Sequence, residues 1–295
     1  MENQIIYHYT NLDSALAILK SKCIWASCSD YLNDYREITY TTIGFKDFLQ
    51  EKAKGLKDKS QKKHIDKMLS YYFTNPEEKR KQIFITSFSG SPDLLSQWRG
   101  YADDGYGLSI GFNINELKLP IAALNTGIAD YDYYLIKVNY SEDEKNAFFE
   151  YLFQFSGTDG FWLDDKPAFY NLESVLDNII SLSPSEVTRF RTFNILEKTS
   201  PALKDKCFQE ENEWRIVKYA KVHEYINGKV PADFNIRSNG RGLIPYFTLN
   251  ISERTIANIV VGPKADYKKI YYALRMIESK YGHSFAISKS NITYI

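Results

Sequence analysis

The sequence predicts a mixed α+β protein, because it contains two kinds of hydrophobic pattern. Short runs rich in β-branched and aromatic residues are typical of strands, and the clearest are Gln82–Phe88, Gly105–Phe112, Gly242–Asn250 and Ile256–Val261. Longer stretches between them place apolar residues every three or four positions, as on one face of a helix. Neither internal repeats nor a Gly/Pro/Ser-rich linker is visible, so we expect a single domain over residues 1–295.

The first expected unit is a strand, a turn and a helix. Ile5–Tyr9 is short, apolar and aromatic, which favours a strand. Thr10, followed by Asp13 three residues later, resembles a capping box, and Leu12–Leu19 carries apolar residues at helical spacing. Ile24–Ser27 then follows as a short extended stretch.

Two helical insertions are expected, near residues 35–82 and 141–205. Alternating apolar and charged faces mark their clearest helices, which are Phe45–Lys54, His64–Phe73, Glu142–Phe155 and Ser174–Leu182. Lysines crowd the stretch 52–63, which is either a solvated helical face or a docking patch for RNA or an acidic partner.

The remaining chain is expected to complete the sheet. Ala265–Tyr281 is an amphipathic helix with Gly282 as its C-cap. A polar loop containing Trp98 is expected between the strands ending at Phe88 and starting at Gly105. Further strands are expected at Tyr133–Val138, Lys206–Tyr219, Phe285–Ile287 and Ile292–Ile295.

Composition excludes several classes of protein. Lys and Arg total 37, as do Asp and Glu, so a whole-protein basic field for nucleic acid is absent. Three cysteines without a Cys-x-x-Cys pair, and four histidines without ligand spacing, predict neither a disulfide framework nor a bound metal. No secretory signal and no run of 18 apolar residues is visible, so we expect a cytoplasmic protein without membrane contact.

Three short polar and aromatic motifs are the candidates for chemistry. The first is Tyr7-His8-Tyr9-Thr10, where a neutral histidine at a strand end can hold a ribose hydroxyl or an amide, or can be a satisfied structural residue. The second begins with Ser87-Phe88-Ser89, whose two hydroxyls share one strand face.

The second motif continues with Gln97-Trp98-Arg99-Gly100-Tyr101. Hydroxyls beside a Trp and a Tyr suit an aromatic ring that carries a carboxamide, whereas the alternative is a capped loop with packed aromatics.

The third motif is the acidic segment before Trp214. On a strand, Glu211 and Glu213 would share one face, and two such close carboxylates repel unless a cation or a substrate lies between them. The alternative is an exposed strand end whose glutamates pair with Arg215 or Lys218.

Taken in order, these motifs resemble two known groups of proteins. The segments around His8, Ser87–Tyr101 and Glu211–Arg215 are similar to a widespread bacterial family described only as a domain of unknown function, over about residues 5–263. A strand-borne His, a Ser-x-Ser strand and a Glu-x-Glu strand also resemble the ADP-ribosyltransferase superfamily. That resemblance implies a split, curved antiparallel sheet around an NAD cleft, with helical insertions.

The superfamily resemblance also implies roles for individual residues. Glu213 would bind the nicotinamide ribose and stabilise the developing oxocarbenium ion, and Glu211 would orient or deprotonate the acceptor. His8 would bind the adenosine ribose, Ser87 would support the nicotinamide ribose, and Ser89 would brace the strand that carries the glutamates. The other expected NAD contacts are Tyr9, Thr10, Trp98, Arg99, Tyr101 and Arg215, with Trp98 or Tyr101 stacking on nicotinamide and Arg99 or Arg215 holding the pyrophosphate.

The sequence therefore predicts a mono-ADP-ribosyltransferase that consumes NAD, without a metal. Its acceptor would be RNA, DNA or protein, with RNA preferred, and its setting would be a bacterial toxin or anti-phage effector with a neutralising partner. Phe88 stands where many superfamily members have Thr, and about 80 residues follow Glu213, beyond the usual minimal fold. Other readings are an NAD glycohydrolase on the same site, a non-catalytic module that binds a nucleotide or a partner, and a structural protein.

Overall fold

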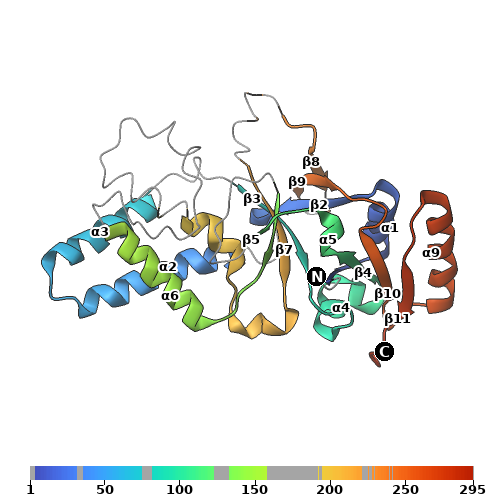
Figure 1. Cartoon of the computed structure of the whole chain (residues 1–295), viewed down its shortest axis with the longest axis horizontal. Helices are drawn as coiled ribbons and strands as arrows, with labels where there is room; N and C mark the ends of the chain where they lie inside the picture. The colour runs from blue at the N-terminus through green and yellow to red at the C-terminus, as the bar shows by residue number, and fades with distance from the viewer. Residues whose placement is uncertain are drawn as a thin grey trace.

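In the residues that the structure describes, the chain is mixed α+β, with two open sheets that are largely antiparallel and several helices. The computed structural model describes residues 4–31, 36–74, 82–122, 133–157, 192, 195–220, 225, 228, 230–238, 240 and 242–294. The order of its helices and strands is shown in Figure 1.

The smaller sheet has four strands in the order β1-β4-β10-β11. Their bounds are β1 Ile5–Thr10, β4 Leu108–Asn113, β10 Ile256–Val261 and β11 Ala286–Lys289. β4 pairs antiparallel with β1 and with β10, whereas β11 runs parallel to β10. Helices α1 (Leu12–Ser21) and α9 (Tyr267–Tyr281) contact each other beside this sheet.

The larger sheet has seven strands in the order β5-β6-β7-β3-β2-β9-β8. Their bounds are β5 Ile121–Ala122, β6 Tyr134–Lys137, β7 Trp214–Ala220, β3 Gln82–Phe88, β2 Cys23–Cys28, β9 Leu243–Asn250 and β8 Phe234–Ser238. All neighbours in this sheet are antiparallel except β5 and β6.

A hydrophobic core joins one face of each sheet. Phe84, Ile216 and Phe247 from the larger sheet belong to the same buried cluster as Ile110 and Phe112 from the smaller sheet. Alternate residues of these strands are buried in this core, as the period-two arrangement of strand side chains requires. Burial of this much apolar surface is the main term that holds the two sheets together.

The expected helical insertion at 35–82 contains two helices in the described residues, α2 (Arg36–Gly55) and α3 (Lys59–Thr74). They pack with α6 (Glu142–Gly157) around a second buried cluster, and the three helices lie together at one end of the molecule (Figure 1). In the lysine-rich stretch, Lys52 pairs with Glu150 and Lys54 with Glu51. Its docking role stays a prediction, and the helix expected at Ser174–Leu182 lies outside the described residues.

The smaller elements complete the described chain. Two short helices are α4 (Leu95–Tyr101) and α5 (Ile114–Leu117). The 3-10 helices are η1 (Ser29–Tyr31), η3 (Asp103–Gly105), η4 (Ser200–Ala202) and η5 (Lys206–Glu211).

Several sequence-based expectations need correction. The cap of α1 is Asn11 rather than Thr10, because the Asn11 side chain accepts a hydrogen bond from the Ser14 N–H. The segment expected to be a loop around Trp98 contains helix α4. Residues 291–294 form no strand. By contrast, the amphipathic helix that ends at Gly282 is confirmed, since Gly282 has φ 73° and donates to the Glu278 carbonyl.

Candidate functional site

The two sheets meet at a seam formed by β1 and the end of β3. The Tyr7 N–H donates to the Ser89 carbonyl and the Ser89 N–H donates to the Tyr7 carbonyl, both at 2.8 Å. This reciprocal pair attaches the first sequence motif directly to the second. The two motifs lie far apart in the sequence, since Ser87 comes 79 positions after His8, and are therefore brought together by the fold.

His8 lies at this seam as a neutral imidazole. Its Nδ1 is 3.0 Å from the Ser87 carbonyl oxygen, so Nδ1–H donates and Nε2 keeps a lone pair that can accept a hydrogen bond. Burial lowers the pKa of His8, while the hydrogen bond to Ser87 opposes that change. The ring is therefore uncharged near neutral pH and can accept a hydrogen bond from a hydroxyl.

The second motif also holds the third motif in place. The Ser89 hydroxyl donates to the Glu211 carbonyl at 2.8 Å, and the Gly90 N–H donates to the Asn212 carbonyl at 2.9 Å. A Cβ on Gly90 would lie 2.2 Å from Asn212 Nδ2 and 3.1 Å from the Asn212 carbonyl oxygen, so a larger residue here would require the Asn212 side chain to move. Ser89 therefore contacts the acidic segment through the backbone carbonyl of Glu211 rather than through a glutamate side chain.

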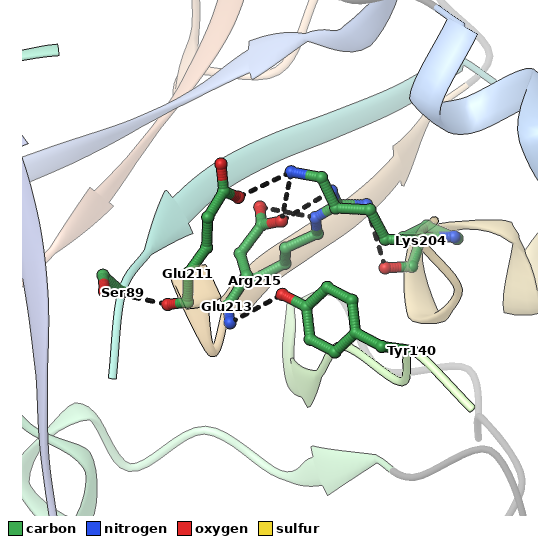
Figure 2. A network of polar contacts seen from close by, with 7 residues as sticks. Ser89, Tyr140, Lys204, Glu211, Glu213 and Arg215 are labelled. Atoms are coloured by element: carbon green, nitrogen blue, oxygen red, sulfur yellow. Dashed lines mark hydrogen bonds and ion pairs between the residues drawn. The ribbon is translucent and has the colours of Figure 1, made fainter. Parts of the chain in front are cut away.

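The acidic segment is not the strand that the sequence predicts. Residues Lys206–Glu211 form the 3-10 helix η5, Asn212 has φ 42°, and β7 begins only at Trp214. A strand face therefore does not bring Glu211 and Glu213 together. Both carboxylates instead converge on the ammonium group of Lys204 (Figure 2).

Four charged side chains form what we call the carboxylate cluster: Lys204, Glu211, Glu213 and Arg215. Lys204 Nζ lies 2.7 Å from Glu211 Oε2 and 3.1 Å from Glu213 Oε2. Arg215 donates from Nε to Glu213 Oε1 at 2.7 Å and from Nη2 to Glu213 Oε2 at 2.8 Å. Its Nη1 donates to the Pro201 carbonyl at 3.1 Å.

The electrostatics of the cluster keep Glu213 ionised. Burial alone would raise the pKa of this carboxyl, but the charges and hydrogen bonds of Arg215 and Lys204 outweigh burial and lower the pKa to about 2. The Glu213 side chain is 5% exposed, whereas that of Glu211 is 14% exposed. The cluster thus presents one fixed, buried carboxylate and one that is more accessible.

Tyr140 joins the cluster from the turn after β6. Its hydroxyl oxygen accepts from the Glu213 N–H at 3.0 Å, as Figure 2 shows. Burial raises the pKa of Tyr140 to about 12, so its hydroxyl stays protonated and retains a proton to donate. Tyr140 is half-buried and lies next to the residue expected to stabilise charge.

Trp98 and Tyr9 support the loop that follows β3. The two rings meet edge to face at 4.9 Å, and Trp98 Nε1 donates to Asp93 at 2.6 Å. The Tyr9 hydroxyl donates to the Ser91 carbonyl and accepts from the Leu94 N–H. Trp98 is fully buried and therefore offers no ring face to a nicotinamide in this structure.

The remaining predicted contacts are divided between surface and interior. Tyr101 and Arg99 lie on the exposed side of α4, and the Arg99 guanidinium is 5.9 Å from the Tyr294 ring. Thr10 is buried. Arg215 is also buried, and three of its donors are used by Glu213 and Pro201, whereas a pyrophosphate needs an accessible guanidinium.

Sequence reasoning missed Lys204 and Tyr140. Lys204 follows the buried residues Ala202 and Leu203, and a lysine at the end of such a run is one signal of a buried charge. Its ammonium group also lies 4.6 Å from the centroid of the Phe208 ring. Tyr140 carries no comparable signal, because tyrosines are abundant in this chain.

Comparison with known proteins agrees with the expectation of a family of unknown function over part of the chain. Residues 97–216 match the family described as "Protein of unknown function (DUF2971)". This segment contains Tyr140 and all four residues of the carboxylate cluster, but not the His8 motif. No curated protein and no solved structure matches the chain.

Two further findings concern the described residues alone. In that part of the chain, no three His, Cys, Asp or Glu side chains gather as they would around a metal ion. Likewise, none of the described helices is both long and apolar enough to cross a membrane.

Proposed function

We propose that the protein binds NAD at the seam and transfers its ADP-ribosyl group to an acceptor. The observation that carries this proposal is the convergence of three distant motifs: the His8 imidazole contacts the Ser87 carbonyl, and the Ser89 hydroxyl donates to the Glu211 carbonyl. His8 is a neutral imidazole and Ser87 an exposed serine at this seam, and Glu213 is an ionised carboxylate in the segment that Ser89 holds in place. The two-sheet architecture is consistent with the superfamily that the motifs resemble.

The chemistry requires a fixed negative charge beside a sugar. The bond between C1′ of the ribose and the nicotinamide nitrogen breaks, and its electron pair leaves with nicotinamide. The ribose becomes oxocarbenium-like, and a preorganised carboxylate stabilises that positive charge. Glu213 fits this role because it stays ionised and is held on both oxygens by Arg215 and Lys204.

Because Glu211 and Glu213 differ in exposure, we assign them different roles. Glu211 is the more exposed, and it would accept the proton of the acceptor as the acceptor attacks C1′. Lys204 bridges both carboxylates and would hold them in a fixed relation. The His8 imidazole would accept a hydrogen bond from the adenosine ribose, and Ser87 would support the nicotinamide ribose.

Nicotinamide release from NAD by the purified chain tests this proposal. We expect Glu213→Gln to lose turnover by roughly 100-fold or more, as for removal of other preorganised charge stabilisers. Because this carboxylate also pairs with two buried cations, circular dichroism first establishes that the variant is folded under the assay conditions. The matched control is Glu210→Gln, because Glu210 is an exposed neighbour of the same chemistry outside the cluster. Equal turnover in the Glu213 and Glu210 variants would refute the role of Glu213.

Transfer to an acceptor is measured separately from release of nicotinamide. We expect Glu211→Gln to spare release of nicotinamide to water while reducing transfer to added cellular RNA or protein. Equal loss of both activities would contradict this division, and release without any transfer would identify an NAD glycohydrolase. Expression of the active chain in bacteria, with and without the Glu213 substitution, tests the proposed setting as a toxin or anti-phage effector.

A further inference from the structure

One face of the seven-stranded sheet carries an aromatic and cationic platform beside the seam. We define the platform as Trp25 on β2, Tyr246 on β9 and Arg237 on β8. Directly paired residues of antiparallel strands point to the same side of a sheet. The pairs Ser27–Tyr246 and Ile244–Arg237 therefore place all three platform residues on one face, opposite the buried core.

The same face also carries Ser87 and Arg215 of the candidate site. Ser87 pairs with Arg215 across β3 and β7, and Ser27 pairs with Ile85 across β2 and β3. Continuing that antiparallel register by two residues sets Trp25 opposite Ser87. Because neighbouring strands lie about 4.8 Å apart, Trp25 is roughly 10 Å from the strand that carries Arg215.

The two halves of this sheet face differ in how far other residues cover them from solvent. Over β6, β7 and β3 the face is covered, since Tyr134 and Val217 pack against Ala202, and the Tyr219 hydroxyl donates to the Lys198 carbonyl. Over β2, β9 and β8 it is more open, with Trp25 36% exposed and Tyr246 partly exposed. The open half adjoins Ser87, which is itself exposed.

The chemistry of the platform matches stacking of nucleobases. The Trp25 and Tyr246 rings lie 4.7 Å apart with an interplanar angle of 37°, and the Arg237 guanidinium lies 5.9 Å from the Trp25 ring. Arg237 Nη2 donates to the Ser27 hydroxyl, but its buried Nε has no hydrogen-bond partner in the structure as described. The Ser27 contact holds the guanidinium beside the Trp25 ring, where it adds a positive charge to the platform.

The geometry points to a binding site for single-stranded nucleic acid on this platform, which presents the acceptor to the seam. Unpaired bases stack on aromatic side chains of open sheet faces, and nearby arginines attract the phosphates. The inference of a binding site depends only on the platform residues. The inference that this site presents an acceptor for ADP-ribosylation rests on the proposed function.

Fluorescence anisotropy of labelled 12-nucleotide RNA and DNA of one sequence tests this inference with the full chain, without NAD. We expect a Kd of about 1–100 µM near 100 mM salt for at least one of the two strands. Trp25→Ala should raise that Kd about 5- to 100-fold, the range for loss of one stacked base, while Trp25→Phe should keep most of the affinity. Arg237→Gln should lower the slope of log affinity against log salt by about 0.7.

Matched controls lie on α9, away from the platform. Tyr272→Ala removes an aromatic ring that is more exposed than Trp25, and Arg275→Gln removes an exposed arginine; both variants should bind as the wild type does. Absence of single-strand binding, equal binding by Trp25→Ala, or binding to duplex alone would overturn the inference. So would a Trp25→Ala variant that loses NAD binding but keeps RNA binding.

The NAD and RNA measurements separate this inference from the proposed function. Strand binding that depends on Trp25, without nicotinamide release, would support the platform and refute the proposed reaction. Nicotinamide release without binding of single-stranded nucleic acid would support the proposed reaction and refute the binding site on the platform.

Discussion

The carboxylate cluster and the ion pairs of the helical region use the same chemistry in different surroundings. In the carboxylate cluster, Lys204, Glu213 and Arg215 are almost wholly buried. On the helices, Lys145 pairs with Glu142 at 2.5 Å, but half of the Glu142 side chain is exposed. Taking charges out of water is costly inside a protein and nearly free at its surface. The stability of the carboxylate cluster therefore depends strongly on each charged partner, whereas that of the helical ion pairs does not.

This difference bears on function. An exposed pair can exchange its partner for water at little cost, so it fixes no geometry. The buried cluster can hold Glu213 only while both cations remain, and Tyr140 fixes the backbone of the same residue. A site that stabilises charge in a transition state needs such fixed groups.

The largest expected effect is on stability, from removing one cation of the cluster. Arg215→Met leaves the buried Glu213 carboxylate with Lys204 alone and should lower the free energy of unfolding by about 3–5 kcal/mol. Urea unfolding followed by circular dichroism measures this loss. The double variant Arg215→Met with Glu213→Leu should recover part of the stability, and a loss below about 1 kcal/mol in the single variant would contradict the account.

A second effect concerns acid pH. The folded pKa of Glu213 is about 2, below its ordinary value of 4.5. The ionised carboxylate therefore adds to the free energy of unfolding in full above about pH 4.5, and this stabilisation is lost as the pH falls toward 2. The contribution is on the order of 3 kcal/mol. Unfolding free energies measured from pH 6 to pH 3 should fall more steeply for the wild type than for Glu213→Gln. Parallel curves would show that Glu213 is not held ionised.

The smallest effect belongs to the helical pair and serves as the comparison for the first. Glu142→Gln removes the charge that Lys145 and the Tyr40 hydroxyl contact, yet the site is half exposed. The expected loss of unfolding free energy is about 0–1 kcal/mol, and it should shrink further in high salt. A loss as large as that of Arg215→Met would erase the distinction between the two regions.

Much of the fold could be predicted because its strands carry their own signal. Gln82–Phe88 and Ile256–Val261 are runs of β-branched and aromatic residues, and both are strands with the expected bounds. The strand β8 (Phe234–Ser238) was missed, since its exposed residues show little hydrophobic pattern. Segment Lys206–Asn212 was predicted as strand, but contacts from Ser89 and Gly90, distant in sequence, fix it as a 3-10 turn.

The candidate site could be predicted only in outline. Motif order was enough to expect the three motifs to be neighbours, and hydrogen bonds join them, because Tyr7 pairs with Ser89 and the Ser89 hydroxyl donates to the Glu211 carbonyl. The binding roles expected for His8, Ser87 and Glu213 stay predictions. The partners of Glu213 could not be predicted, because pairing with Lys204 and Tyr140 depends on where η5 and the turn after β6 meet. Trp98 shows the converse: an aromatic ring expected to bind a ligand instead packs against Tyr9 inside the protein.

The most direct test of the central claim is calorimetric titration of NAD into the wild type and His8→Ala. His8 contributes to the seam and stands apart from the charges of the cluster, so its loss probes the joint site rather than the stability of the cluster. We predict NAD binding by the wild type and an affinity at least about tenfold lower for His8→Ala, which corresponds to roughly 1.4 kcal/mol. His64→Ala, on helix α3, is the control and should bind NAD as the wild type does. A folded wild type that binds no NAD, or a His8→Ala variant with unchanged affinity, would contradict the claim that the motifs form one NAD site.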